Sequence, residues 1–242
     1  MLGLLYKDYI AVKGKYFLVA LLGQLVLITG IRFLVPAETA DIILMPLVLV
    51  ILCCLAGMIP FSFEVRLMKT DEGRKQKQYF LSLPVSRRQY VASKYVFLAI
   101  AFYMVQAVGS FEFIVCQVNV KSERMAADIT SSQLLVIAFI SVCLIVCAFE
   151  LPFFIGMGVK RGRAAKEGLF FAFFFLVIAY IMFGDLSIFD TAGLTELFEY
   201  LASHPEIGIA VQVLAPLVSI LLFYVSYRIS ARIFERKEWE DE

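Results

Sequence analysis

The sequence has few of the side chains from which enzymes build catalytic or metal sites. It contains one histidine, His204, and its five cysteines form no CxxC pair and no metal-type spacing. It holds no HExxH motif, no paired aspartate motif and no serine–histidine arrangement within an apolar run. A membrane protease or another membrane enzyme therefore lacks support, and we assign no catalytic residue and no metal ligand.

A glycine-rich phosphate loop is also missing. The pattern G-x-x-x-x-G-K-[S/T] holds nucleotide phosphates with its backbone amides and its lysine. The Gly14-Lys15 pair has neither the preceding glycine nor a following serine or threonine. We therefore expect the chain to bind no nucleotide cofactor and to hydrolyse no ATP by itself.

Charge is scarce, because only 18% of the residues are charged while 61% are hydrophobic, and the mean hydropathy is +0.85. Soluble domains average about 45–50% apolar residues, so the composition predicts several membrane-spanning segments surrounded by lipid. The net charge of +1 gives no reason to expect a nucleic-acid partner. The cysteines lie within apolar runs, where we expect them to act as small packing residues: Cys53, Cys54, Cys116, Cys143 and Cys147.

Six apolar runs are long enough to form membrane-spanning helices, since about 20 residues cross a hydrocarbon core of about 30 Å. Their ranges are 16–35, 42–61, 91–115, 134–158, 168–184 and 207–227. The sequence therefore predicts an all-α membrane protein with a single transmembrane domain over residues 1–242.

The segments that join these runs alternate in their content of lysine and arginine. Of the 22 basic residues, all but Arg32, Lys121 and Arg124 lie in the first, third, fifth and seventh segments. The positive-inside rule places such segments in the cytoplasm. We therefore expect both termini to be cytoplasmic and the acidic segment 185–206 to form an outer loop.

The segment before the first run predicts an amphipathic helix on the cytoplasmic leaflet. Leu2, Leu5, Tyr9 and Val12 recur at spacings of three and four and would form an apolar face. Asp8, like the lysines of this segment, would lie away from that face. A frayed extension of the first span is the alternative.

The most charged stretch, residues 62–94, lies between the second and third runs. Residues 76–83 place aromatic and leucine side chains beside basic ones, which predicts a short helix that Pro84 ends. Ser86 and Gln89 then match a capping box, with serine at the N-cap and glutamine three residues later. We expect the third span to begin at Ser86 and to leave the cytoplasm as one continuous helix.

The stretch SLPVSRRQYVASKY (residues 82–95), with Asp71-Glu72 before it and the six-run layout around it, resembles the permease subunit of a bacterial type 2 ATP-binding-cassette (ABC) exporter. The likeness is greatest to small permeases without a fused ATPase, including exporters of amphipathic and antimicrobial peptides. It implies a dimer with a second, identical or homologous permease in the bacterial plasma membrane. It also implies two separate cytoplasmic ATPase subunits, which bind ATP and magnesium.

The resemblance further implies that the loop 62–90 holds a coupling helix, which docks on the ATPase. Carried over residue by residue, the contacts with the ATPase fall on Gln76, Lys77, Gln78, Tyr79, Phe80, Leu81, Ser82, Leu83, Pro84, Arg87 and Arg88.

Two acidic residues lie inside predicted spans, where an ionisable group is costly and is a candidate for function. Glu150 lies in the fourth run, just before Pro152, and would either face a substrate cavity or make a structural contact with another span. Glu112 lies nearer the outer end of the third run, where it would either act on substrate or extend toward the outer interface.

Two other functions fit the same pattern. The chain is either the membrane component of an ABC-type sensing or resistance complex, or a six-span secondary transporter. The second alternative would explain the intramembrane glutamates, although the runs show no evident inverted repeat. A neighbouring gene for an ATPase with a phosphate loop would favour the ABC interpretation.

Overall fold

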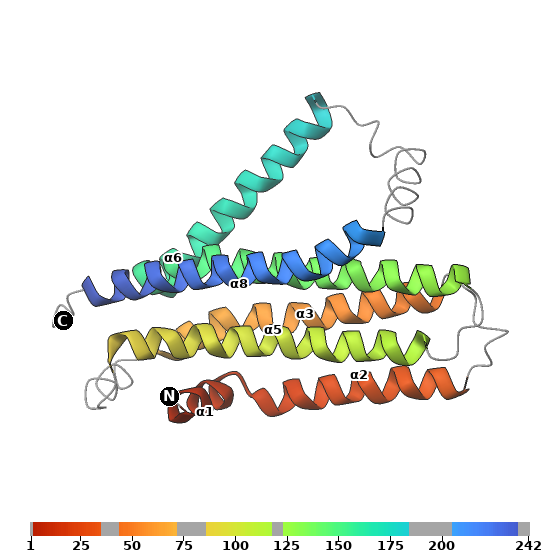
Figure 1. Cartoon of the computed structure of the whole chain (residues 1–242). Helices are drawn as coiled ribbons and strands as arrows, with labels where there is room; N and C mark the ends of the chain where they lie inside the picture. The colour runs from red at the N-terminus through yellow and green to blue at the C-terminus, as the bar shows by residue number, and fades with distance from the viewer. Residues whose placement is uncertain (1, 35–43, 72–85, 118–122, 184–204, 237–242) are drawn as a thin grey trace.

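The computed structural model describes residues 2–34, 44–71, 86–117, 123–183 and 205–236. These residues form α-helices, with no strand among them. The helices are α1 (Leu2–Ala11), α2 (Gly14–Leu34), α3 (Leu44–Asp71), α5 (Arg87–Gln117), α6 (Glu123–Phe183) and α8 (Pro205–Arg236). Figure 1 shows α2, α3, α5, α8 and the first part of α6 running side by side.

The core lies where α6 packs against α3, α5 and α8, and α2 closes one edge against α5 and α3. Its largest fully buried apolar side chains include Phe102, Phe113, Leu144 and Leu151. Many other apolar residues stay exposed on the outer faces of the bundle, as expected for helices in contact with lipid. The four cysteines Cys53, Cys116, Cys143 and Cys147 are buried and free, as predicted, and Cys54 is half-buried.

Four of the described helices are long and apolar enough to cross a membrane: Val48–Asp71, Arg87–Gln117, Ser132–Gly168 and Gln212–Arg236. A fifth candidate is formed by α1 and α2 together, which are bent by 73° at the turn between them. The chain is therefore a multi-pass, all-α membrane protein. Each of the six predicted runs is helical over its described residues, but the described chain supplies four or five candidate spans rather than six.

Both ends of the loop expected at 62–90 are helical in the structure. Helix α3 continues past residue 61 to Asp71, and α5 begins at Arg87. The sequence prediction assigned the charged residues after Ser62 to water, but Glu64 is fully buried and Asp71 contacts side chains from α1 and α5. Partners from other helices therefore allow α3 to continue through this polar stretch.

Helix α6 bends sharply at Gly158, whose backbone has φ 80° and ψ 172°. Glycine adopts this conformation readily because it has no Cβ atom. The residues after the bend lead away from the bundle (Figure 1), and we call residues 159–183 the distal arm. The basic stretch 160–166, expected as a loop between two spans, is instead helical and belongs to this arm.

Helices α1 and α2 meet at a tight turn in which Lys13 has a positive φ of 57°. Gly14 follows it, and a Cβ atom at that position would lie 2.1 Å from the Tyr9 ring. This close approach explains the need for glycine and fixes the angle between the two helices. Leu4, Asp8 and Val12 form the buried side of α1, so the expected location of Asp8 away from the packed face is wrong.

Candidate functional site

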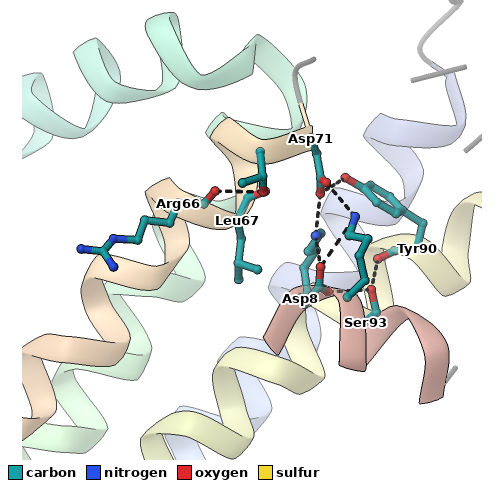
Figure 2. A network of polar contacts seen from close by, with 9 residues as sticks. Asp8, Arg66, Leu67, Asp71, Tyr90 and Ser93 are labelled. Atoms are coloured by element: carbon teal, nitrogen blue, oxygen red, sulfur yellow. Dashed lines mark hydrogen bonds and ion pairs between the residues drawn. The ribbon is translucent and has the colours of Figure 1, made fainter. Parts of the chain in front are cut away.

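The predicted coupling segment, Gln76 to Pro84, lies outside the described residues. The structure does describe the two helix ends that hold this segment, Asp71 at the end of α3 and Ser86 before α5. Helix α1 contacts Asp71 of α3 and Ser93 and Lys94 of α5, so polar side chains from the three helices meet near these ends (Figure 2). We call this cluster the loop base, and it consists of Lys7, Asp8, Asp71, Tyr90, Ser93 and Lys94.

Ser86 begins α5 through the predicted capping box. The Ser86 backbone amide donates to the Gln89 side-chain oxygen at 3.2 Å, and the Gln89 amide donates to the Ser86 hydroxyl at 3.3 Å. These bonds satisfy two amides that the first turn of a helix leaves without partners. The start of α5, and so the exit of the loop, is fixed by local sequence.

Lys94 is the centre of the loop base and is fully buried. Its ammonium lies 2.5 Å from an Asp71 oxygen and also pairs with the buried carboxylate of Asp8. The Lys7 ammonium lies 2.7 Å from the other Asp71 oxygen. Two carboxylates and two ammonium groups therefore face one another, and the cluster is balanced in charge.

Two neutral hydroxyl groups also contact the carboxylates of Asp8 and Asp71. The Tyr90 hydroxyl donates to Asp71 at 2.6 Å, and the Ser93 hydroxyl lies 3.3 Å from an Asp8 oxygen. The ammonium groups of Lys7 and Lys94 lie 5.7 Å and 5.3 Å from the centre of the Tyr90 ring, within range of a cation–π interaction. Figure 2 shows these side chains pointing toward one another, whereas Arg66 points away.

The end of α8 reaches the same region from the opposite side of α5. Arg88 holds the Glu235 carboxylate with two nitrogens at 2.5 Å and 3.2 Å, and Arg87 donates to the Glu235 backbone carbonyl. The ring of Tyr90 stacks on Phe234 with centroids 5.3 Å apart. Both arginines of the predicted coupling set thus contact α8. Their contact with an ATPase stays a prediction.

Tyr95 ties α5 to α8 one step further into the bundle. Its buried hydroxyl lies 2.7 Å from the hydroxyls of both Ser226 and Ser230. Ser226 in turn donates to the Ala148 carbonyl of α6. The stretch SRRQYVASKY therefore contacts α1, α3 and α8 directly and reaches α6 through Ser226.

Sequence reasoning singled out this stretch but missed the groups that it contacts. The burial of Asp8 could have been predicted, because its spacing of four residues from Leu4 and Val12 places it on the same helical face. A carboxylate on a packed apolar face needs a buried cation. Nothing in the sequence indicated that the cation would be Lys94, which lies 86 residues away.

The two predicted intramembrane acids lie in different surroundings. Glu112 is fully buried and accepts a hydrogen bond from Gln24 of α2 at 3.0 Å, with the Cys53 thiol 3.7 Å away. It therefore does not extend to the outer interface, and its hydrogen bond with Gln24 joins α5 to α2. Glu150 is buried and pairs with Lys166 at 2.7 Å, so its described partner is a residue of the distal arm.

Comparison with known protein families supplies one match. The family model described as ABC-2 family transporter protein matches residues 3–235, which is nearly the whole chain. A search of curated proteins gave no match. Within the part of the chain that the structure describes, no three histidine, cysteine, aspartate or glutamate side chains cluster in a way that suits a metal ion.

Proposed function

Because the chain belongs to the ABC-2 transporter family, we propose that it is the membrane subunit of an exporter that moves its substrate out of the cell. Family membership and the apolar helices establish a membrane subunit of an ABC transporter, which works with an ABC ATPase. Export across the bacterial plasma membrane extends that conclusion and rests on the resemblance of the sequence to exporter permeases. The cytoplasmic location of both termini rests on the basic segments between the apolar runs.

The loop base is the observation that carries the mechanism. Residues 72–85 join α3 to α5, and any force on this segment acts first on Asp71 and Ser86. Because Asp71 pairs with buried Lys94 of α5 and half-buried Lys7 of α1, ion pairs join the three helices. We expect them to move as one unit when the ATPase closes on ATP.

The proposed coupling segment, Gln76 to Pro84, is the contact with a separate ATPase subunit, which binds ATP and magnesium. The chain itself contributes no catalytic group, and its work is mechanical. A second permease subunit completes the transport pathway. Closure of the two ATPases switches the cavity between the permeases from inward to outward access.

Amphipathic peptides are the proposed substrate class. Support for this class comes from the resemblance of the sequence to small peptide-exporting permeases without a fused ATPase. A membrane component of a sensing or resistance complex would use the same coupling segment. The experiment below distinguishes it from an exporter.

The test is reconstitution of the chain in proteoliposomes with the ATPase encoded beside it. We expect amphipathic peptides to stimulate ATP hydrolysis and to move across the bilayer in an ATP-dependent manner. Stimulation without movement would identify a sensing complex. Absence of an adjacent ATPase gene, together with ATP-independent movement, would contradict the exporter assignment.

A further inference from the structure

A second buried charge cluster lies inside the bundle, apart from the loop base and independent of the proposed export function. Glu64 of α3 is fully buried within the candidate span Val48–Asp71. It faces Glu150 and Lys166 of α6, whose ammonium lies 2.7 Å from Glu150 and 3.7 Å from Glu64. The sequence prediction missed Glu64 because it assigned residues after Ser62 to water.

The hydrogen bonding of Glu64 is incomplete. Among the described residues neither of its carboxylate oxygens has a hydrogen-bond donor, although both are buried. Its carboxyl group and that of Glu150 both approach the same Lys166 nitrogen, at 3.7 Å and 2.7 Å, so the two carboxyl groups are neighbours. Two ionised carboxylates repel each other and have no hydrogen to share, so a hydrogen bond between them requires a proton.

The net charge of the cluster leads to the same requirement. Two ionised carboxylates and one ammonium carry a net charge of −1, and an uncompensated charge buried in a membrane protein is costly. Within the described part of the chain, the Cys147 thiol of α6 and the Tyr95 hydroxyl of α5 are the other buried titratable groups near Glu64, and neither is a cation. One bound proton makes the cluster neutral.

We propose that Glu64, Glu150 and Lys166 form a proton-binding site in which the two carboxyl groups share one proton beside the Lys166 ammonium. A divalent metal ion is a poorer occupant. Calcium and magnesium require six or more oxygen ligands, whereas two carboxyl groups converge here and Lys166 already occupies one of them.

The site also spans the bend of α6. Glu150 precedes Gly158 and Lys166 follows it, so the Lys166–Glu150 pair joins the distal arm to the bundle. If the arm swings outward, Lys166 leaves and the two carboxylates lose their cation. The site then takes up a second proton, so the position of the distal arm and the number of bound protons are linked.

Infrared spectroscopy of the full-length chain in lipid nanodiscs tests the proposal, because a protonated carboxylic acid has a carbonyl band that a carboxylate lacks. Asp8 and Asp71 are paired with lysines, whereas Glu112 is a buried carboxyl that makes no ion pair among the described residues, so all variants carry E112Q. We expect E112Q protein to show the band at neutral pH, with a shift in D₂O, and E64Q/E112Q protein to lack it. The E112Q protein with exposed Glu167→Gln should keep the band.

Removal of the lysine supplies a second, independent measurement. In K166M/E112Q protein both carboxyl groups should be protonated, so the area of the band should about double. Absence of the band from E112Q protein at neutral pH would overturn the proposal, as would a band that E64Q leaves unchanged. A band that disappears when Na⁺ replaces K⁺ would also overturn it, by showing that a metal cation occupies the site.

Discussion

Lys94 is the residue on which the loop base most depends, because its ammonium pairs closely with both carboxylates, whereas the Lys7 ammonium lies 2.7 Å from Asp71 but 3.8 Å from Asp8. Asp8 reaches it from α1 and Asp71 reaches it from α3. Its removal leaves Lys7 as the remaining cation of the loop base. When a buried carboxylate loses its cation, water cannot reach it to take the place of that cation, so the loss costs more than at an exposed carboxylate.

We therefore expect Lys94→Met to destabilise the protein by about 3–5 kcal/mol, the usual cost of removing one partner from a buried ion pair. Thermal unfolding in detergent measures the effect, with exposed Lys69→Met of α3 as the matched control. The double variant K94M/D8N keeps the Lys7–Asp71 pair and should recover part of the loss. Equal stability of K94M and wild type would contradict the assigned role of Lys94.

At the scale of elements, the bend in α6 separates the bundle from the distal arm. Gly158 permits it because its φ of 80° is unfavourable for residues with a Cβ atom. The arm itself is rich in exposed aromatic side chains, including Phe171, Phe174 and Phe175, as expected for a helix in contact with lipid or a neighbouring subunit.

A Gly158→Ala exchange should straighten or strain this bend, at a cost of about 1–3 kcal/mol. Gly168 of the same arm is the matched control, because it is helical and has open space where a Cβ atom would lie. Gly168→Ala should be neutral or stabilising by up to about 1 kcal/mol. Thermal unfolding of the two variants compares them directly, and equal melting temperatures would show that the backbone at Gly158 is not special.

Several elements were predictable from sequence because their causes are local. The apolar runs identified the helices, since a bilayer fixes the length of a span, and Ser86 with Gln89 identified the start of α5. The extension of α3 was missed because its polar residues are satisfied by groups far away in sequence. Glu64 meets Lys166, and Asp71 meets Lys94 and Lys7.

The sequence predicted where the candidate site lies, but not which side chains contact one another in it. The charged stretch and its capping box marked the region between the second and third runs. The roles of Asp8, Tyr90 and Lys94 depend on the approach of three helices, which local pattern does not encode. The bend at Gly158 was missed because a glycine beside a basic stretch is also typical of an ordinary loop.

For the whole molecule, the buried clusters divide the bundle into parts with different tasks. The loop base joins α1, α3 and α5 beside the segment 72–85, and Arg88 adds the end of α8. The Glu64–Glu150–Lys166 site lies further inside and joins α3 to the distal arm. Helix α3 carries Asp71 of the loop base and Glu64 of the inner site, so both clusters are attached to the same helix.

The coupling role of the segment Gln76 to Pro84 is tested most directly by measuring ATP-driven export by the Leu81→Glu variant. The complex with its ATPase is reconstituted in proteoliposomes, and ATP hydrolysis and substrate export are measured together, with exposed Lys69→Gln as the control. We predict that L81E inserts normally but shows neither substrate-stimulated hydrolysis nor export, because a carboxylate would replace the leucine of the proposed contact with the ATPase. Normal export by L81E would contradict the coupling role of this segment.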